Sequence, residues 1–227
     1  GAAALLFRDA DARSRLRIAT TPAGASEINL LDDAGTRRAA LAATATGTPS
    51  LALQDAKNKP RLALDLSLGG DPSLSLADKQ GMQRIGATVA AGNTPAITLR
   101  NAKGRERIAL RAEENNAAEL TLNDTEGAVR ATLRTEKHGY PALILQDENN
   151  VKRAELAGAA TGATLSFYGK NWKPQLAIGE SGAAAPGLRL FHPDGIHHLA
   201  LLEINPENKP ILEFRNLKGK EIWSTPK

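Results

Sequence analysis

Apolar and polar residues alternate along this chain in a pattern that repeats about every 23 residues. The repeated motif reads L-x-L-x-D-x-x-G-x-x-R-x-x-L, and six successive steps of 23 residues are followed by steps of 22, 23 and 24. The ten repeats begin near Leu5, Ile28, Leu51, Leu74, Ile97, Leu120, Leu143, Leu165, Leu188 and Leu212. Self-similarity at a short fixed period is the signature of repeat proteins, so the sequence predicts a single repeat domain over residues 1–227.

Each repeat carries two segments whose alternation is typical of half-buried strands, for example residues 50–54 and 61–66. The Asp-x-x-Gly or Asp-x-x-Asn link between them is turn chemistry, because Asp bonds nearby backbone N–H groups and Gly or Asn accepts a positive φ. The link to the next repeat often ends in proline, as at Pro49 and Pro72, and proline suits the first residue of a strand. No helix of ordinary length is predicted.

Three architectures fit a two-stranded repeat of this length. In a parallel β-solenoid, equivalent residues stack roughly 4.8 Å apart, so arginines in one column would repel each other. In an antiparallel meander they lie roughly 9.6 Å apart, and every connection is a short hairpin. A five-bladed propeller has the right length but needs strands that pack on both faces. The sequence therefore favours an all-β, repetitive antiparallel sheet with a thin core of Leu, Ile and Ala, and the solenoid is the main alternative.

A basic residue follows the turn in the first seven repeats, and alternation directs it away from the leucine face. This column comprises Arg15, Arg38, Arg61, Arg84, Arg107, Arg130 and Arg153. Arginines in register form a candidate anion-facing stripe for a polyanion, an anionic lipid surface or an acidic partner. The structural alternative, which the sequence favours, is that their stems cover apolar surface and protect a long sheet from aggregation.

The last repeats, residues 165–227, depart from the motif and are rich in aromatic residues. Seven of the eight aromatic residues lie after residue 139: Tyr140, Phe167, Tyr168, Trp172, Phe191, Phe214 and Trp223. Such repeats either cap the open end of a stack or provide the anchors of an interface. The candidate partner-interface residues are Tyr168, Trp172, Phe191, His192 and Trp223.

Three of the four histidines, His192, His197 and His198, lie close together in the sequence. Because neighbours on a strand point to opposite faces, at most one of His197 and His198 can join His192. The sequence therefore predicts no metal site and no cofactor, and we expect His198 to take the place of the repeat arginine.

Composition narrows the function classes. The chain has 227 residues, a formal net charge of +4 and no cysteine, which excludes disulfides, thiolate zinc sites and cysteine nucleophiles. No apolar run approaches 18 residues, so no membrane-spanning helix is predicted. No phosphate-binding Gly-rich loop, Gly-x-Ser-x-Gly or His-Glu-x-x-His motif occurs, and basic and aromatic residues do not interleave as in nucleic-acid binders. The sequence predicts a protein that is not an enzyme and has no nucleic-acid partner.

The alternating strand, the Asp-x-x-Gly turn and the basic residue soon after it resemble the YD-type (RHS) repeats of bacterial surface and toxin-shell proteins, with Leu at the Tyr position. The resemblance implies a location outside the cytoplasm, in the periplasm or at the cell surface. The amino-terminal stretch 1–7 is small and apolar. It is expected to be either the trailing edge of a signal peptide or membrane anchor, or simply the start of the first repeat.

Taken together, these features predict a non-catalytic scaffold or accessory subunit of a larger extracytoplasmic or membrane-associated assembly, of the respiratory or photosynthetic type. Its partners would be protein subunits of that assembly. The alternative is a surface adhesin or glycan-binding module that uses the aromatic carboxy-terminal repeats.

Overall fold

A computed structural model of the chain describes residues 2–90, 92–112, 117–135, 138–181, 184–204 and 209–225. The chain divides into two compact units, residues 1–114 (unit 1) and residues 115–227 (unit 2). Among the described residues the regular elements are all β-strands, two to each 23-residue repeat, and none is an α-helix. Of the amino-terminal stretch, Gly1 lies outside the described residues, and the residues that follow enter the first strand.

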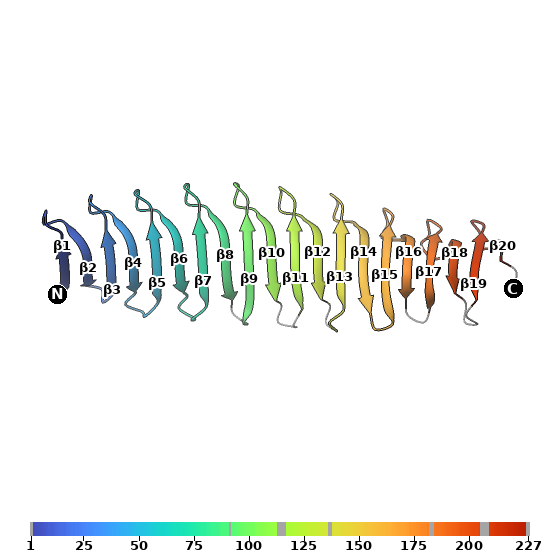
Figure 1. The fold of residues 1–227 in the computed structure, drawn as a ribbon, viewed down its shortest axis with the longest axis horizontal. Helices are drawn as coiled ribbons and strands as arrows, with labels where there is room; N and C mark the ends of the chain where they lie inside the picture. Colours follow the sequence, from blue (N-terminus) through green and yellow to red (C-terminus); the bar gives the residue numbers. More distant parts are fainter. Residues whose placement is uncertain are drawn as a thin grey trace. The chain divides into compact units, whose positions relative to one another are not determined.

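Unit 1 is built from ten strands that run up and down in sequence order (Figure 1). They are β1 (Ala4–Arg8), β2 (Ser14–Thr20), β3 (Ser26–Leu31), β4 (Arg37–Ala43), β5 (Pro49–Gln54), β6 (Pro60–Leu66), β7 (Pro72–Ala77), β8 (Gln83–Ala90), β9 (Thr94–Arg100) and β10 (Glu106–Ala112). Each strand pairs antiparallel with the next one in the chain.

Unit 2 repeats this plan. Its strands are β11 (Ala118–Asn123), β12 (Val129–Thr135), β13 (Pro141–Gln146), β14 (Lys152–Ala159), β15 (Gly162–Tyr168), β16 (Pro174–Ser181), β17 (Ala184–Phe191), β18 (His198–Ile204), β19 (Pro210–Arg215) and β20 (Glu221–Ser224). Every consecutive pair is again antiparallel. This order confirms the predicted sheet of repeated hairpins and excludes the parallel solenoid, whose neighbouring strands would run in the same direction.

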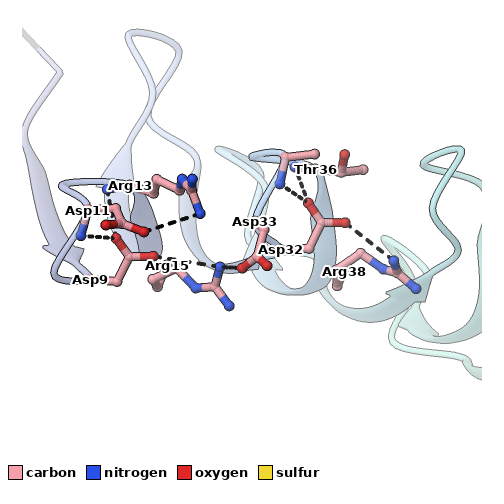
Figure 2. Close-up of polar contacts among 9 residues, drawn as sticks. Asp9, Asp11, Arg13, Arg15, Asp32, Asp33, Thr36 and Arg38 are labelled. Atoms are coloured by element: carbon pink, nitrogen blue, oxygen red, sulfur yellow. Dashed lines mark hydrogen bonds and ion pairs between the residues drawn. The ribbon is translucent and has the colours of Figure 1, made fainter.

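The motif Asp organises the turn inside each hairpin. In the second repeat, Oδ1 of Asp32 accepts the backbone N–H of Ala34 at 3.0 Å and of Thr36 at 2.9 Å (Figure 2). Gly35 then closes the turn at φ 73°, and Asn58 does so in the third repeat at φ 61°. Because a left-handed φ suits Gly and Asn best, the x-x-Gly and x-x-Asn spacing of the sequence corresponds directly to this turn.

The motif Arg stands at a β-bulge. In the second repeat, Leu31 lies opposite Arg37 and Leu30 lies opposite Ala39, so Arg38 has no partner across the hairpin. The same register shift sets apart Arg15, Arg61, Arg84, Arg107, Arg130 and Arg153. A bulge re-aims the side chain of the extra residue, which here directs the guanidinium group toward the turn.

The sheet of each unit has two unlike faces, and the position of the core differs from the prediction. The leucines are not buried: Leu64 is 43% exposed and Leu41 is 51% exposed. The least exposed residues lie on the other face, for example Ala40 and Ala109 in unit 1 and Thr132 and Ala177 in unit 2. Of the predicted thin core of Leu, Ile and Ala, the alanines are buried, but the prediction is wrong for the leucine rows, because within each unit the described strands form one layer that leaves that face uncovered.

Candidate functional site

The candidate site is the leucine-rich side of the sheet, called here the apolar face. In unit 1 it consists of three rows that run across the strands. The first row is Leu5, Ile18, Ile28, Leu41, Leu51, Leu64, Leu74, Ala87, Ile97 and Leu110. The second row is Phe7, Leu16, Leu30, Ala39, Leu53, Leu62, Leu76, Ile85, Leu99 and Ile108. The third row is Thr20, Ser26, Ala43, Pro49, Leu66, Pro72, Val89 and Pro95.

None of the side chains in these three rows carries a charge, and only Thr20 and Ser26 are polar. Single exposed apolar residues are ordinary on protein surfaces, but large contiguous apolar patches mark interaction sites. The rows therefore form one continuous uncharged surface over all ten strands of unit 1.

Unit 2 carries the same kind of face. Its first row is Leu120, Leu133, Leu143, Leu156, Leu165, Ile178, Leu188, Leu202 and Leu212. The second row ends in two aromatic residues, Phe214 and Trp223, whose rings pack with centroids 5.8 Å apart. The predicted interface residue Trp223 therefore belongs to the apolar face and is half exposed there.

The apolar face of unit 1 is hollowed along its length. Three hollows adjoin one another: about 690 Å³ beside Ile28 and Leu41, about 290 Å³ between Leu41 and Leu64, and about 520 Å³ around Ala87. The first two share Leu41 and Pro49, and the second and third share Leu64 and Pro72. They form an apolar trough that runs across the strands, between the leucine row and the proline-bearing row.

The opposite side of each sheet, called here the mixed face, covers itself with its own long side chains. Ion pairs lie along it between Arg111 and Glu106 at 2.6 Å in unit 1 and between Arg189 and Glu203 at 2.8 Å in unit 2. The apolar stems of such residues shield the backbone and small side chains beneath them, while their charged ends meet water. Leucine cannot do this for the apolar face, because its short side chain reaches no further than its neighbours.

The structure places the predicted arginine stripe within a network of turn contacts. Arg38 lies 3.3 Å from Oδ2 of Asp32, and Arg153 lies 2.6 Å from Oδ2 of Asp147. Corresponding pairs join Arg15 to Asp9, Arg61 to Asp55, Arg84 to Asp78 and Arg130 to Asp124. Each of these arginines thus has a carboxylate partner inside its own repeat, and Arg15 also pairs with Asp33 of the next repeat (Figure 2). Asn101 stands at the Asp position of the repeat that contains Arg107, and binding of an external anion to the stripe stays a prediction.

The same arginines also link successive repeats. Arg38 donates to the backbone carbonyl of Gln54 at 3.1 Å, and Arg130 donates to that of Asp147 at 2.6 Å. Arg84 donates to the backbone carbonyl of Asn101. Each of these acceptors belongs to the following hairpin. Repeat proteins depend on such contacts between neighbouring repeats, so these contacts explain a periodic arginine without any ligand.

The pKa values of the turn carboxylates are lowered by the groups that contact them. Backbone N–H groups, with help from the paired arginine, keep the pKa of Asp32, Asp55, Asp124 and Asp147 below the usual value. At Asp78 desolvation, the largest influence, opposes this, but the N–H groups and Arg84 still leave its pKa lowered. All five therefore carry a full negative charge at neutral pH and act as fixed partners in the turns.

The predicted interface residues of the carboxy-terminal repeats are not gathered in one place. Tyr168 lies on the mixed face and donates its hydroxyl to Glu155 at 2.8 Å, while Lys152 lies 4.3 Å from its ring centroid. Phe191 packs edge-on against His198 with ring centroids 5.1 Å apart. Desolvation is the largest cause that raises the pKa of Tyr168 and lowers that of His198. These residues join local clusters on different strands rather than one pocket.

The histidines flank a carboxylate. Nδ1 of His192 lies 2.9 Å and Nδ1 of His197 lies 2.6 Å from the same oxygen, Oδ2 of Asp194. The hydrogen bond from His197 is the first cause of the lowered pKa of Asp194. This cluster agrees with the expectation that only one of His197 and His198 reaches His192. In the part of the chain that the structure describes, no group of three His, Asp or Glu side chains is placed to hold a metal ion.

The expectation for His198 is wrong. The turn before β18 is one residue longer than the others, because the N–H of His192 bonds the carbonyl of His197, five residues on. His198 consequently pairs with Phe191, and Leu199 takes the bulge position that arginine holds in earlier repeats. A one-residue insertion in a turn shifts every position that follows it, and spacing counted along the sequence missed that shift.

Trp172 is the one predicted interface residue that is held in a strained conformation. It closes its turn at φ 61°, where Asn58 and Asn150 stand in other repeats, and its side chain is 53% exposed. A bulky residue at a left-handed φ costs about 1–2 kcal/mol, so we expect Trp172→Asn to raise the free energy of unfolding by about 1 kcal/mol.

Urea unfolding followed by far-ultraviolet circular dichroism measures this effect. The matched variant is Asn150→Trp, which should lose about as much stability as Trp172→Asn gains. A stability that falls or stays level in Trp172→Asn would contradict the strain. A gain in stability combined with loss of partner binding would identify Trp172 as a residue kept for recognition.

No family model matches this chain, and a search among curated proteins finds no match. Among the described residues, no helix has the length and apolar character needed to cross a membrane. The apolar face itself was missed as a site because alternation marks the side of a strand that is apolar, not whether a second layer covers it. The sequence did contain an indication of this site, because it predicts neither helices nor a second set of strands that could cover the leucines.

Proposed function

We propose that this protein is a non-catalytic structural subunit that uses its apolar face to join a larger protein assembly. The proposal rests on one observation: the three rows of the apolar face in unit 1 form a continuous surface without charge. Leu41 and Leu64 on this surface are about half exposed. Apolar area left in water is unfavourable by roughly 25 cal/mol per Å². Covering this face with protein is therefore the main source of free energy that the chain has for binding.

The chemistry of the motif supports a structural role. The motif Asp accepts two backbone N–H groups and pairs with the motif Arg, as Asp147 does with Val151, Asn149 and Arg153. Both charged residues of the motif are thereby committed to holding the hairpin. A catalytic carboxylate needs a perturbed pKa suited to proton transfer near neutral pH, whereas these carboxylates are more acidic than usual.

The proposal places the protein outside the cytoplasm, as a scaffold or accessory subunit of an extracytoplasmic or membrane-associated assembly of the respiratory or photosynthetic type. The resemblance of its motif to YD-type repeats supports this location. The partners would be protein subunits that present an uncharged surface to the apolar face.

Affinity purification from native membranes and from the extracytoplasmic fraction tests this function. We expect the chain to recover a partner subunit in stoichiometric amount, identified by mass spectrometry. Leu64→Lys, which places a charge on the apolar face, should lose the partner. Leu68→Lys makes the same chemical change in an exposed turn, where Leu68 is 77% exposed, and should keep the partner. A partner retained by Leu64→Lys would contradict the role of the apolar face.

A second candidate function is a surface adhesin or glycan-binding module. It is favoured by Trp172, an exposed indole at the tip of a turn, since exposed aromatic rings supply contact area at a low entropic cost. Titration with oligosaccharides should then change the tryptophan fluorescence, and Trp172→Asn should abolish that change. No response from the unaltered protein would remove this candidate.

A further inference from the structure

The chain leaves more surface in water than a folded chain of this mass normally does. The accessible surface of the chain is 14352 Å². Two separate globular bodies that share its 24.0 kDa equally would expose about 12,000 Å² together. The chain therefore exposes about 2,400 Å² more than two ordinary domains of that size. Obligate protein interfaces bury about 2,000–5,000 Å², so an excess of this size is in the range that a permanent partner covers.

The shape of the face suits a flat partner of the same kind. Ten strands spaced roughly 4.8 Å apart, with three rows roughly 6.8 Å apart, give each unit a face of roughly 800 Å². This is about the area that one partner contributes to a standard interface. Two adjacent leucine-rich rows lie beside one row of mostly smaller residues, and the trough beside Leu64 and Ala87 has room for side chains from an opposing sheet. Two sheets that pack face to face lie about 10 Å apart with interdigitated side chains.

The charge pattern favours a second copy over a charged partner. The rows that face outward in unit 1 carry no charge, so they offer nothing to which an acidic or basic surface could be complementary. The third row, with Thr20, Ser26 and the prolines, also lacks the cations that would draw the face to an anionic lipid surface. A surface that fits this one is flat, uncharged and periodic at the same spacing, and the chain itself carries such a surface.

We propose that two copies of this chain pack apolar face against apolar face, so that each single-layer sheet becomes one layer of a two-layer β-sandwich. The inference rests on the proposed function and names the partner of the same face. In the sandwich, the leucine rows of both copies form the core that the sequence pattern implies, while the mixed faces with their ion pairs remain in water.

Single-cysteine variants test the proposal cleanly, because the chain has no cysteine of its own. Ala87→Cys places a thiol in the trough of the apolar face, and Leu68→Cys places one in the exposed turn. Light scattering should give the purified chain a mass of twice 24.0 kDa. At the protein concentration at which light scattering shows the dimer, we expect maleimide to modify Ala87→Cys at least about tenfold more slowly than in dilute solution, as for a position inside an interface. The rate for Leu68→Cys should not depend on concentration.

A lysine on the apolar face should then dissociate the pair. We expect Leu64→Lys to have the mass of one chain and an unchanged strand signal in circular dichroism, while Leu68→Lys keeps the mass of two. If Leu64→Lys does not fold, the protection of Ala87→Cys still decides the question. A single-chain mass at every concentration, or a dimer in which Ala87→Cys stays fully reactive, would overturn the proposal.

Two other coverings are separate outcomes that also overturn it. Protection of Ala87→Cys in a monomeric chain by phosphatidylcholine vesicles would assign the face to a lipid surface. Protection only inside a purified heterologous assembly would assign it to another protein. The second result would leave the proposed function standing while the second copy fails, so the two failures are distinguishable.

Discussion

Replacing Gly179 by alanine is expected to lower the free energy of unfolding of unit 2 by about 3 kcal/mol or more. Gly179 lies in β16 with φ 123°, next to a register shift in the pairing with β17. A Cβ built there would lie 2.0 Å from the backbone oxygen of Ala163 in β15 and 3.1 Å from Cα of Thr164. Both obstacles are backbone atoms of the neighbouring strand, so relief requires the strands to separate and their hydrogen bonds to lengthen.

Gly86→Ala is the matched control for this change. Gly86 has no left-handed φ, and the nearest obstacles to its Cβ are the side-chain atoms Nε2 of Gln83 and Oγ1 of Thr98, at 2.8 and 3.2 Å. Other repeats carry Ala40 and Ala109 at the same position. We expect Gly86→Ala to change stability by no more than about 0.5–1 kcal/mol, and a gain would reflect the lower entropy of the unfolded chain.

Far-ultraviolet circular dichroism in urea reports the strands of both units and compares the two variants. The fluorescence of Trp172 and Trp223, the two tryptophans of the chain, assigns the change in Gly179→Ala to unit 2. The unfolding midpoint in circular dichroism should fall strongly for Gly179→Ala and stay nearly level for Gly86→Ala. Equal midpoints for both variants would show that β15 and β16 adjust to a side chain at this position.

Low pH should unfold the protein cooperatively, because protonation removes the charge of the Asp residues that hold its turns. The pKa values of Asp32, Asp55, Asp78, Asp124 and Asp147 are all lowered in the folded chain. A carboxyl group with a lowered pKa contributes stability that is complete above its unfolded pKa of about 4. That contribution is lost as the pH falls through the still lower folded pKa. Stability should therefore be level near neutral pH and fall steeply below about pH 4, with proton uptake on unfolding.

A variant with asparagine at these five positions is the control. Asparagine preserves the turn, as Asn101 shows: its Oδ1 accepts the N–H of Lys103 at 2.9 Å and of Arg105 at 3.1 Å. The variant should therefore fold at neutral pH, although the missing ion pairs lower its stability somewhat. Its stability should fall much less steeply at low pH. Thermal unfolding from about pH 7 down to about pH 2.5 measures the slopes. An acid limb that stays equally steep in the variant would assign acid sensitivity to other carboxyls.

The turns and strands could be predicted from the sequence, because they depend on residues that are neighbours along the chain. The Asp-x-x-Gly turn involves residues within a few positions of one another, so its hydrogen bonds, such as those of Asp32, follow from the motif. The period of two predicted the strands, and the short links predicted that they pair as consecutive hairpins. The six-residue turn before His198 shows the limit, because one inserted residue changed which side chain reached the bulge.

The contacts of the candidate residues could not be predicted from the motif, because they depend on which residues the fold brings close together in space. The motif places Arg38 six residues after Asp32, and only the fold shows that the bulge turns this arginine back to that carboxylate and onward to the carbonyl of Gln54. The contact of Tyr168 with Glu155 likewise joins two strands and has no counterpart in the repeat motif. These contacts make the arginine column part of the scaffold, a role that spacing alone could state only as an alternative.

The sequence by itself determined that this protein is a stack of two-stranded repeats with one apolar and one mixed face, because period, alternation and turn residues are local properties of the chain. Only the tertiary structure decided which face is covered. Burial depends on what lies above a sheet, and within each unit the single layer leaves the leucines beside Leu64 in solvent while ion-paired side chains shield the mixed face. For that physical reason, the rows that alternation marks as a core are the surface through which we propose the protein assembles.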